Sequence, residues 1–280
     1  MMSAIAAVEA RILDDPDDAA AWAAYAPYLL EQGDVRCELV ALAALEDTPA
    51  KREALARIDR ERARWEPYQM TDCVWRHGFV VGATLRIDGR REARDLAQRM
   101  VDPKLRLLGS LRLTIAETVP ARALTVLAAA DLGRLRVLRA GYHPRGNRVA
   151  RALVEQPSLK LHTLDLRHSG LTDEALIALA GCAQLRGLRA LYLQHNRLTS
   201  RAVAALARSP ALTGVEVLDL RHNAVGAVGA AALAESPLLG AITALHLHAD
   251  ELEPAGVHAL ATSSTLPRDI VRYWRAQDKT

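Results

Sequence analysis

Leucine pairs recur along this chain at a nearly fixed interval. In the second half, Leu-x-Leu pairs begin at Leu164, Leu191, Leu218 and Leu245, each 27 residues after the last. Counting backwards, related pairs begin at Leu138, Leu111 and Leu85, at spacings of 26, 27 and 26 residues. A repeat of about 20–50 residues is typical of a solenoid, in which each unit buries its apolar face only against its neighbours. The spacing therefore predicts seven stacked units.

Each unit resolves into a short strand and a helix. In "LRALYL", which starts at Leu188, Leu191 and Leu193 lie on one face while Ala190 and Tyr192 lie on the other, which is the alternation of a strand. A helical stretch such as "SRAVAALARSPAL" follows, and its apolar spacing turns Val203, Leu206 and Ala207 inward. Three prolines are placed to end such helices: Pro157, Pro210 and Pro237.

Between strand and helix stands a residue that bears an amide in two units, Asn196 and Asn223. Its side chain can hydrogen-bond turn backbone that neighbouring coils leave unpaired. Other residues take this position in four further units: Ser169, Asp250, His143 and Ala116. The repeat therefore reads LxxLxLxxNxL followed by a helix.

This pattern resembles the leucine-rich repeat family, and a 26–27-residue unit with a full helix looks like its ribonuclease-inhibitor-like class. The resemblance covers roughly residues 74–265 and is most specific in the last four units. It implies an α/β solenoid shaped like a horseshoe, with parallel strands on the concave face and helices on the convex face. Segments around "GFVVGATLRI" and "LPRDIVRYWRAQDKT" are expected to shield the two ends of the stack.

The first 66 residues follow a different, helical pattern. Asp15 is expected to cap a helix that starts at Pro16, and Gly33 to end it. Asp34 is expected to cap the next helix, and a further helix is expected from Thr48 to Arg64. The predicted organisation is a helical domain over residues 1–66, a solenoid over 67–265 and a C-terminal cap over 266–280.

The helical segment also carries a resemblance. It is similar to a small companion domain that precedes leucine-rich repeats in many bacterial proteins. The matching residues are Pro16, Asp17, Asp18, Tyr25, Ala26, Leu29, Gly33, Asp34, Arg36, Glu38 and Leu39. Members of that family carry an acid–aromatic pair where this chain has Pro27-Tyr28. The resemblance implies no activity and favours a bacterial origin.

Charge and cysteine usage indicate which surfaces the chain presents to partners and which cellular compartment it occupies. Residues 1–66 hold 8 basic and 14 acidic side chains, whereas the remainder holds 28 and 19, so the two parts present different surfaces to partners. The three cysteines, Cys37, Cys73 and Cys182, are odd in number and far apart, which argues against a disulfide framework or a structural zinc site. The N-terminus lacks the basic flank of a signal peptide, and no stretch is apolar enough to span a membrane. We expect a cytoplasmic protein.

Strand alternation sends a second set of side chains to the concave face, where stacking should align them in columns. One column is predicted to hold Arg86, Arg112, Arg139, Asp165, Tyr192, Asp219 and His246. A second is predicted to hold Asp88, Thr114, Gly141, Arg167, Gln194, Arg221 and His248. A third is predicted to hold Gly89, Ile115, Tyr142, His168, His195, His222 and Ala249.

Apart from Asp88, Thr114, Ile115, Ala249 and the glycines, all members of these columns are candidate partner-binding residues. A rigid sheet presents them preorganised, and tyrosine and arginine are frequent anchors of protein interfaces. The plainer interpretation is a solvated face, where opposite charges such as Arg139 and Asp165 pair for under about 1 kcal/mol.

Other chemistries fit the residues less well. Asp165, His168 and Ser169 supply the side chains of a catalytic triad, but Ser169 stands at the inward amide position, so no catalytic residue is predicted. The histidine column could share a metal ion, yet ligands on successive strands form a row, so neither a metal site nor a cofactor is predicted. No phosphate-binding loop is present either, and the sequence favours a protein that is not an enzyme.

Nucleic-acid or other polyanion binding remains the alternative function. The front half of the solenoid is rich in arginine, at positions 86, 90, 91, 112, 134, 136, 139, 145 and 148. A phosphate backbone could follow a concave stripe of Arg86, Arg112 and Arg139, but few aromatic residues lie among them. An acidic protein partner would use the same stripe. The sequence therefore favours a protein-interaction module with an unknown, acidic protein partner, and it leaves the oligomeric state open.

Overall fold

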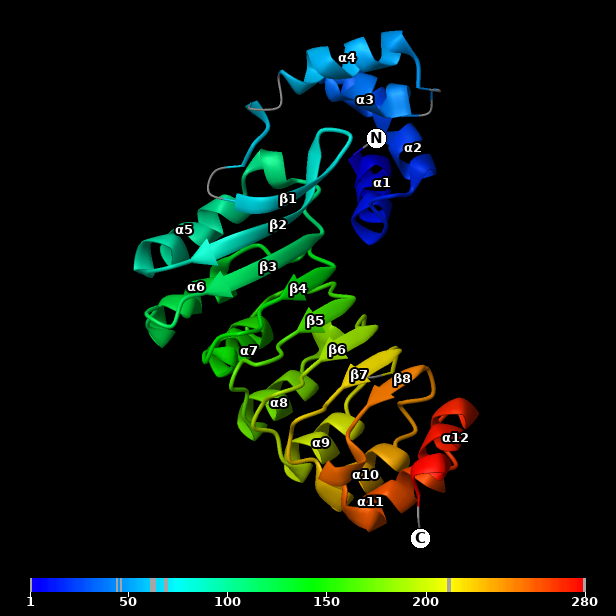
Figure 1. Ribbon diagram of the computed structural model, residues 1–280. Helices are drawn as coiled ribbons and strands as arrows, with labels where there is room; N and C mark the ends of the chain where they lie inside the picture. Colours follow the sequence, from blue (N-terminus) through cyan, green and yellow to red (C-terminus); the bar gives the residue numbers. More distant parts are fainter. Residues whose placement is uncertain are drawn as a thin grey trace.

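The computed structural model describes residues 2–43, 45, 47–60, 64–67, 70–210 and 213–278 and has the expected α/β solenoid architecture. Its sheet has eight strands in sequence order, and Figure 1 shows them fanned along the molecule. The strands are β1 (Met70–Arg76), β2 (Phe79–Ile87), β3 (Ser110–Ile115), β4 (Val137–Arg139), β5 (Thr163–Asp165), β6 (Ala190–Tyr192), β7 (Val217–Asp219) and β8 (Ala244–His246). Strands β2 to β8 pair in parallel, and β1 pairs with β2 in antiparallel fashion.

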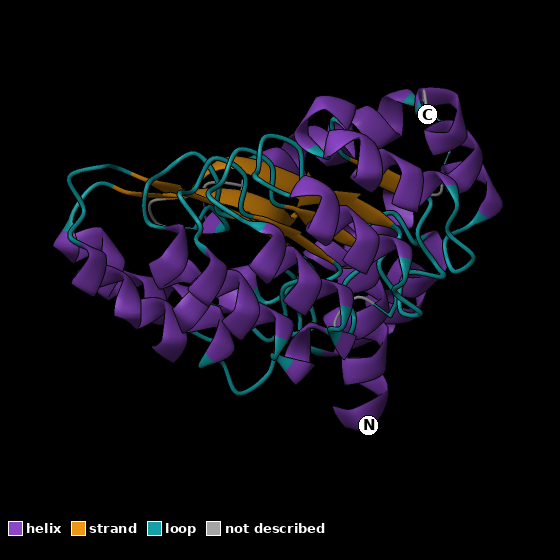
Figure 2. Cartoon of the chain, turned by 90° about the horizontal axis from the view of Figure 1, so that it is seen from below, coloured by secondary structure: helices purple, strands orange, loops and turns teal. Residues whose placement is uncertain are grey.

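The helices of the repeats line one face of this sheet (Figure 2), and the opposite face is called the open face below. They are α5 (Arg90–Met100), α6 (Val126–Ala129), α7 (Gly146–Val154), α8 (Asp173–Ala180), α9 (Ser200–Ala207), α10 (Gly226–Ala234) and α11 (Glu253–Ala261). The leucines of each strand and the apolar stripe of each helix form one continuous core that runs from Val80 to Trp274. The C-terminal helix α12 (Arg268–Gln277) closes that core with Ile270, Val271 and Trp274.

Side-chain amides tie two of the coils to the coils before them, as predicted. The side-chain amide of Asn223 donates to the carbonyls of Leu193 in the preceding coil and Leu220 in its own, at 3.0 and 2.9 Å. Its oxygen accepts the N–H of Leu198 at 3.2 Å. Asn196 bridges the preceding pair of coils in the same way. These bonds satisfy backbone groups that the curve of the solenoid would otherwise leave buried and unpaired.

Two substitutes at the amide position behave differently. Ser169 is fully buried and its hydroxyl donates to the carbonyl of Leu166 at 2.6 Å. The expectation for Asp250 is wrong, because the chain enters the short 3₁₀ helix η6 (Ala249–Glu251) and leaves this side chain exposed.

Four helices precede the sheet: α1 (Met2–Asp14), α2 (Ala19–Glu31), α3 (Arg36–Ala43) and α4 (Pro49–Asp59). The expected cap at Asp15 is wrong, because α1 extends to Asp14 and Asp18 caps α2 by accepting the N–H of Ala21. Gly33 ends α2 with a positive φ of 65°, as expected. Helix α4 stops at Asp59, short of the expected end, and residues 61–63 lie outside the described part.

Helices α1 to α3 pack on the front of the sheet through a second core. Trp22 and Tyr25 of α2 lie against Phe79, with ring centroids 5.7 and 6.0 Å away. The guanidinium of Arg36 lies 3.7 Å from the centre of the Phe79 ring on its other flank. The side chain of Asp14 at the end of α1 forms an ion pair with Arg136, which precedes β4. The helical segment therefore shares its core with the first strands.

Strand β1 was not foreseen from the sequence. It joins β2 through the two-residue turn His77-Gly78, where both residues have positive φ angles, as a tight hairpin with right-handed twist requires. Its pairing with β2 shifts register between Thr71 and Val74 and again at Trp75, so the edge of the sheet is bulged. The front of the stack is therefore shielded by a hairpin and helices together.

The parallel register corrects one sequence alignment. Leu111 pairs with Ala83 and Leu113 with Leu85, so the first strand is displaced by two residues from the predicted alignment. Thr84 consequently stands beside Arg112, whereas Arg86 stands beside Thr114 in the second column. The predicted stripe of three arginines is reduced to Arg112 and Arg139.

Candidate functional site

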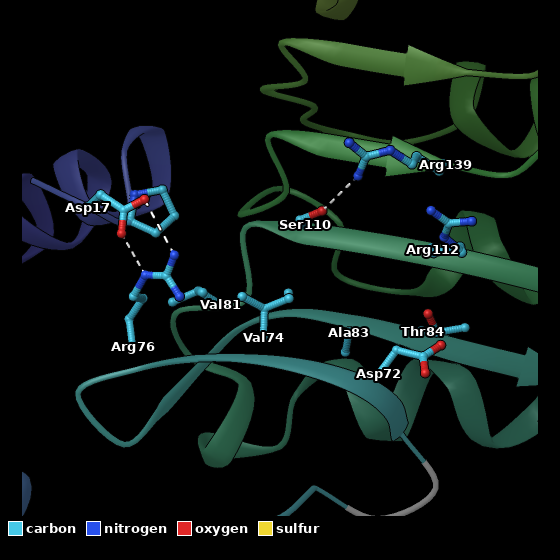
Figure 3. Close-up of a pocket in the computed structure, with 12 residues that line it drawn as sticks. Asp17, Asp72, Val74, Arg76, Val81, Ala83, Thr84, Ser110, Arg112 and Arg139 are labelled. Atoms are coloured by element: carbon cyan, nitrogen blue, oxygen red, sulfur yellow. Dashed lines mark hydrogen bonds and ion pairs between the residues drawn. The ribbon is translucent and has the colours of Figure 1, made fainter.

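A pocket of about 520 Å³ lies at the front of the open face, between the β1–β2 hairpin and strands β3 and β4 (Figure 3). Its walls are Pro16, Asp17, Asp72, Val74, Arg76, Val81, Gly82, Ala83, Thr84, Ser110, Arg112 and Arg139. Strand alternation turns Gly82 and Thr84 of β2 to the same face as their partners Ser110 and Arg112 of β3, whereas Val81 and Ala83 alternate with them and belong to the apolar cores. The pocket combines apolar surface with three guanidinium groups, those of Arg76, Arg112 and Arg139.

The arginines of this pocket differ in what they contact. Arg76 donates to Asp17 in the α1–α2 loop at 2.6 Å, and this bond lowers the pKa of the Asp17 carboxyl. Arg139 donates to the hydroxyl of Ser110 at 3.1 Å. Arg112 is exposed, and within the described part of the chain no hydrogen-bond or ion-pair partner reaches its guanidinium. A positive charge is thus left available at the pocket wall.

Arg86 lies outside this pocket. Its guanidinium contacts Asp88 at 2.7 Å, two residues further along the chain. The charge of Arg86 is therefore already compensated at the exit of β2.

Further along the open face, two aspartates are engaged within their own strands. Asp165 accepts from the backbone and side chain of Arg167, and Asp219 does the same with Arg221. These bonds raise the pKa of both arginines. Asp165 does not form the expected ion pair with Arg139. Its carboxylate instead bonds to the guanidinium of Arg167, two residues further along the chain. Asp165 and Asp219 are buried, and their carboxylates hold the guanidinium groups of Arg167 and Arg221 in place. Neither aspartate is therefore a free acid.

The third column forms a stack of rings. Tyr142, His168, His195 and His222 follow one another with centroid distances of 4.9, 3.9 and 3.8 Å and interplanar angles of 15°, 15° and 23°. All four have φ angles between 49° and 61°, in the left-handed region that costs a residue with a side chain about 1–2 kcal/mol. The chain adopts this backbone in four successive coils and thereby holds the four rings in register. Partial burial, with His168 and His222 on either side, lowers the pKa of His195.

The remaining candidates lie towards the rear. Tyr192 receives the guanidinium of Arg167 over its ring at 5.1 Å. Gln194 is buried, and its Oε1 has no hydrogen-bond partner among the described residues. His246 and His248 line a second hollow of about 430 Å³ beside α12. The structure therefore spreads the predicted residues over a front pocket, a central ring stack and a rear hollow.

The structure separates the residues of the suspected triad. The Ser169 hydroxyl is fully buried and donates to a main-chain carbonyl, whereas the ring of His168 is exposed and lies in the stack. A base must reach its nucleophile within hydrogen-bond distance to activate it. These two side chains point to opposite sides of the chain and cannot act together.

Much of the arginine-rich front half also has structural duties. Arg134 donates to the carbonyls of Leu105 and Met100, and Arg145 to those of Val119 and Glu117. Arg136 is buried against Asp14. These side chains bond to neighbouring segments of the protein, so fewer guanidinium groups remain to contact a partner than the sequence suggests.

Several site residues escaped the sequence analysis. Val74 and Arg76 join the front pocket because the hairpin folds back over the sheet, and Asp17 joins it from the α1–α2 loop, where it accepts from Arg76. The sequence signal for the hairpin was the pair His77-Gly78, which is suited to a tight turn between strands. Glu251 is the fourth, and its contacts with His222 depend on a 3₁₀ turn that has no sequence signature.

The leucine-rich repeat family model matches residues 158–180 and 213–234, which contain strands β5 and β7 and the helices that follow them. These two segments are leucine-rich repeats, a class of repeat that generally serves protein interaction. No curated protein matches the chain. None of the described helices is both long and apolar enough to cross a bilayer.

Proposed function

We propose that this protein is a non-enzymatic interaction module that binds an acidic segment of a partner protein on its open face, at the front pocket. The observation that carries the proposal is the uncompensated guanidinium of Arg112 beside Arg139, with apolar surface in the same pocket. Leucine-rich repeats at residues 158–180 and 213–234 support the general role. The proposed compartment is the cytoplasm.

The two arginines favour a negatively charged ligand. Arg112 and Arg139 are direct neighbours in the β3–β4 register, and like charges placed opposite each other on adjacent strands destabilise a sheet. Asp72 lines the same pocket but forms no ion pair with either of them in the described part of the chain. A carboxylate supplied by a partner would relieve this repulsion with charge-assisted hydrogen bonds.

An apolar side chain next to that carboxylate in the partner would also have a surface to pack against. Val74 is 47% exposed at the pocket, although it is a large aliphatic side chain on a strand. Val81 and Ala83 also border the pocket, but their side chains are buried in the two apolar cores. The pocket thus suits a peptide in which an acidic residue stands next to an aliphatic one, and such a centre with a polar rim is typical of protein interfaces.

Polyanion binding is the second candidate. It rests on the excess of basic over acidic residues in the solenoid, but the structure reduces the continuous arginine stripe to two neighbours. A phosphate backbone is contacted by a row of cations, and affinity then falls steeply with salt. The short row favours a protein ligand.

The test is capture from a lysate of the source organism with wild-type protein, an R112A/R139A variant and a charge-matched R86A/R91A control. Arg86 and Arg91 are exposed, lie outside the pocket and pair with Asp88 and Asp95. We expect a protein that the wild type and the control capture and that R112A/R139A loses. Capture of the same protein by all three would refute the assignment to the front pocket. Loss of capture after nuclease treatment would instead favour polyanion binding.

A further inference from the structure

His222 and His248 come from consecutive coils and meet at the rear of the open face, far along the sheet from the front pocket. Their Nε2 atoms lie 3.3 Å apart. The carboxylate of Glu251 lies beside them, and one ligand atom from each of the three residues lies within 4.8 Å of the others. We infer that this group is a binding site for a zinc-like divalent transition-metal ion.

The distance between the two nitrogens fits one shared ion. Zinc binds imidazole nitrogen at about 2.0–2.1 Å in tetrahedral geometry, which places two ligand nitrogens about 3.3–3.4 Å apart. The observed separation of the two Nε2 atoms matches this spacing. An ordinary hydrogen bond between the rings is the competing explanation, and it would leave the pair indifferent to metal.

Ring orientation explains why the site lies at this end of the histidine stack. His168, His195 and His222 are stacked nearly parallel, so their in-plane lone pairs run side by side and do not converge on a point. His248 belongs to the neighbouring column, and its ring is tilted by 57° from that of His222. That tilt lets the two lone pairs meet. The sequence argued against a metal because ligands on successive strands lie in a row. His222 and His248 depart from that row.

Glu251 supplies charge and orientation. Its carboxylate oxygens accept the backbone N–H of His222 at 2.9 and 3.1 Å, and Oε1 lies 3.6 Å from Nδ1 of the same ring. A carboxylate on the Nδ1 side favours a proton there and leaves Nε2 free to bind a metal, as in carboxylate–histidine–zinc arrangements. Glu251 therefore acts as a positioning residue that also compensates part of the cation's charge.

The site is both rigid and accessible. His195 packs on the other side of the His222 ring at 3.8 Å, so the ring is held before any ion arrives. The His222 side chain is still 49% exposed, which leaves the remaining coordination positions to water. A preorganised and solvent-accessible pair of imidazoles loses little freedom when it binds an ion.

The test is calorimetric titration of the purified chain with Zn²⁺, followed by Co²⁺ absorption spectra, for wild type, H248A and E251Q. The matched control is H258A, which removes an exposed histidine that also lies beside a carboxylate, Asp278, at 2.9 Å. We expect one Zn²⁺ per wild-type chain and a tetrahedral Co²⁺ spectrum. H248A should weaken binding by at least about tenfold and E251Q by about 10–100-fold, whereas H258A should leave it unchanged.

Unaltered zinc affinity in H248A would overturn the inference, as would a loss of equal size in H258A. H222N serves as a second variant, since asparagine tolerates the left-handed backbone of this position, where φ is 57°. Far-UV circular dichroism confirms that each variant is folded. Because His248 has an ordinary φ of −98°, H248A decides the matter even where H222N fails to fold.

Discussion

The buried amide of Asn223 offers the sharpest test of what holds the coils together. In N223A, the carbonyls of Leu193 and Leu220 lose their donor and the N–H of Leu198 loses its acceptor. A buried backbone group left without a partner costs about 1–3 kcal/mol. The side chain is 7% exposed, so water reaches only part of the space, and we expect a loss of about 3–5 kcal/mol.

Urea unfolding followed by far-UV circular dichroism measures this loss, because the free energy of unfolding falls linearly with denaturant. The control is N147A, whose amide is exposed and bonds only to Thr172, so its loss should stay below about 1 kcal/mol. N223D keeps the shape and the acceptor but cannot donate to either carbonyl, so it should be at least as unstable as N223A at pH 7. If N223A and N147A lose similar amounts, the ladder of amides is not what joins the coils.

Three further predictions concern other parts of the chain. A Cβ at Gly141 would lie 2.5 Å from the carbonyl oxygen of Arg167, so G141A should lose about 1–3 kcal/mol, and an unchanged melting temperature would contradict this. Burial lowers the pKa of His143, so the unfolded chain binds its proton first and stability falls as pH drops below about 6.5. H143N should flatten this fall in melting temperature between pH 7.5 and 5, and an equal fall in both proteins would argue against it. F79A should lower the free energy of unfolding in urea by about 3–5 kcal/mol, because Phe79 is buried in the second core. V228A, on the exposed side of α10, should change it little. Similar losses for the two variants would show that the second core is not stabilising.

The repeat was predictable because leucine spacing is a direct consequence of stacking. The order of the strands and the ladder formed by Asn196 and Asn223 followed from the same spacing. The first strand was misaligned because period-two alternation fits Leu85 equally well in two registers, and only packing chooses between them. Asp18 rather than Asp15 caps α2 because four acidic residues surround Pro16, and local propensity does not rank them.

The candidate site was predictable in its columns and not in its contacts. Alternation placed Arg112, Asp165 and His222 on the open face, as the strands show. Whether Asp165 pairs with its own strand or with its neighbour depends on side-chain rotamers, which spacing does not specify. The meeting of His222 with His248 depends on a ring tilt and a turn that break the repeat. The sequence therefore predicts the contacts that recur in every coil, but not those that depend on a local departure from the repeat.

The bulged strand at the front affects how readily a second chain could pair with the end of this sheet. A stack of identical coils could in principle continue from one chain into the next, since an unpaired strand edge is a template for further pairing. Here β1 shifts register twice along its length, which interrupts the row of N–H and C=O groups that an incoming strand would need. At the opposite end β8 is only three residues long, and α12 packs beside it. Both edges of the sheet therefore disfavour the strand pairing that would join one chain to the next, while the interior coils repeat regularly.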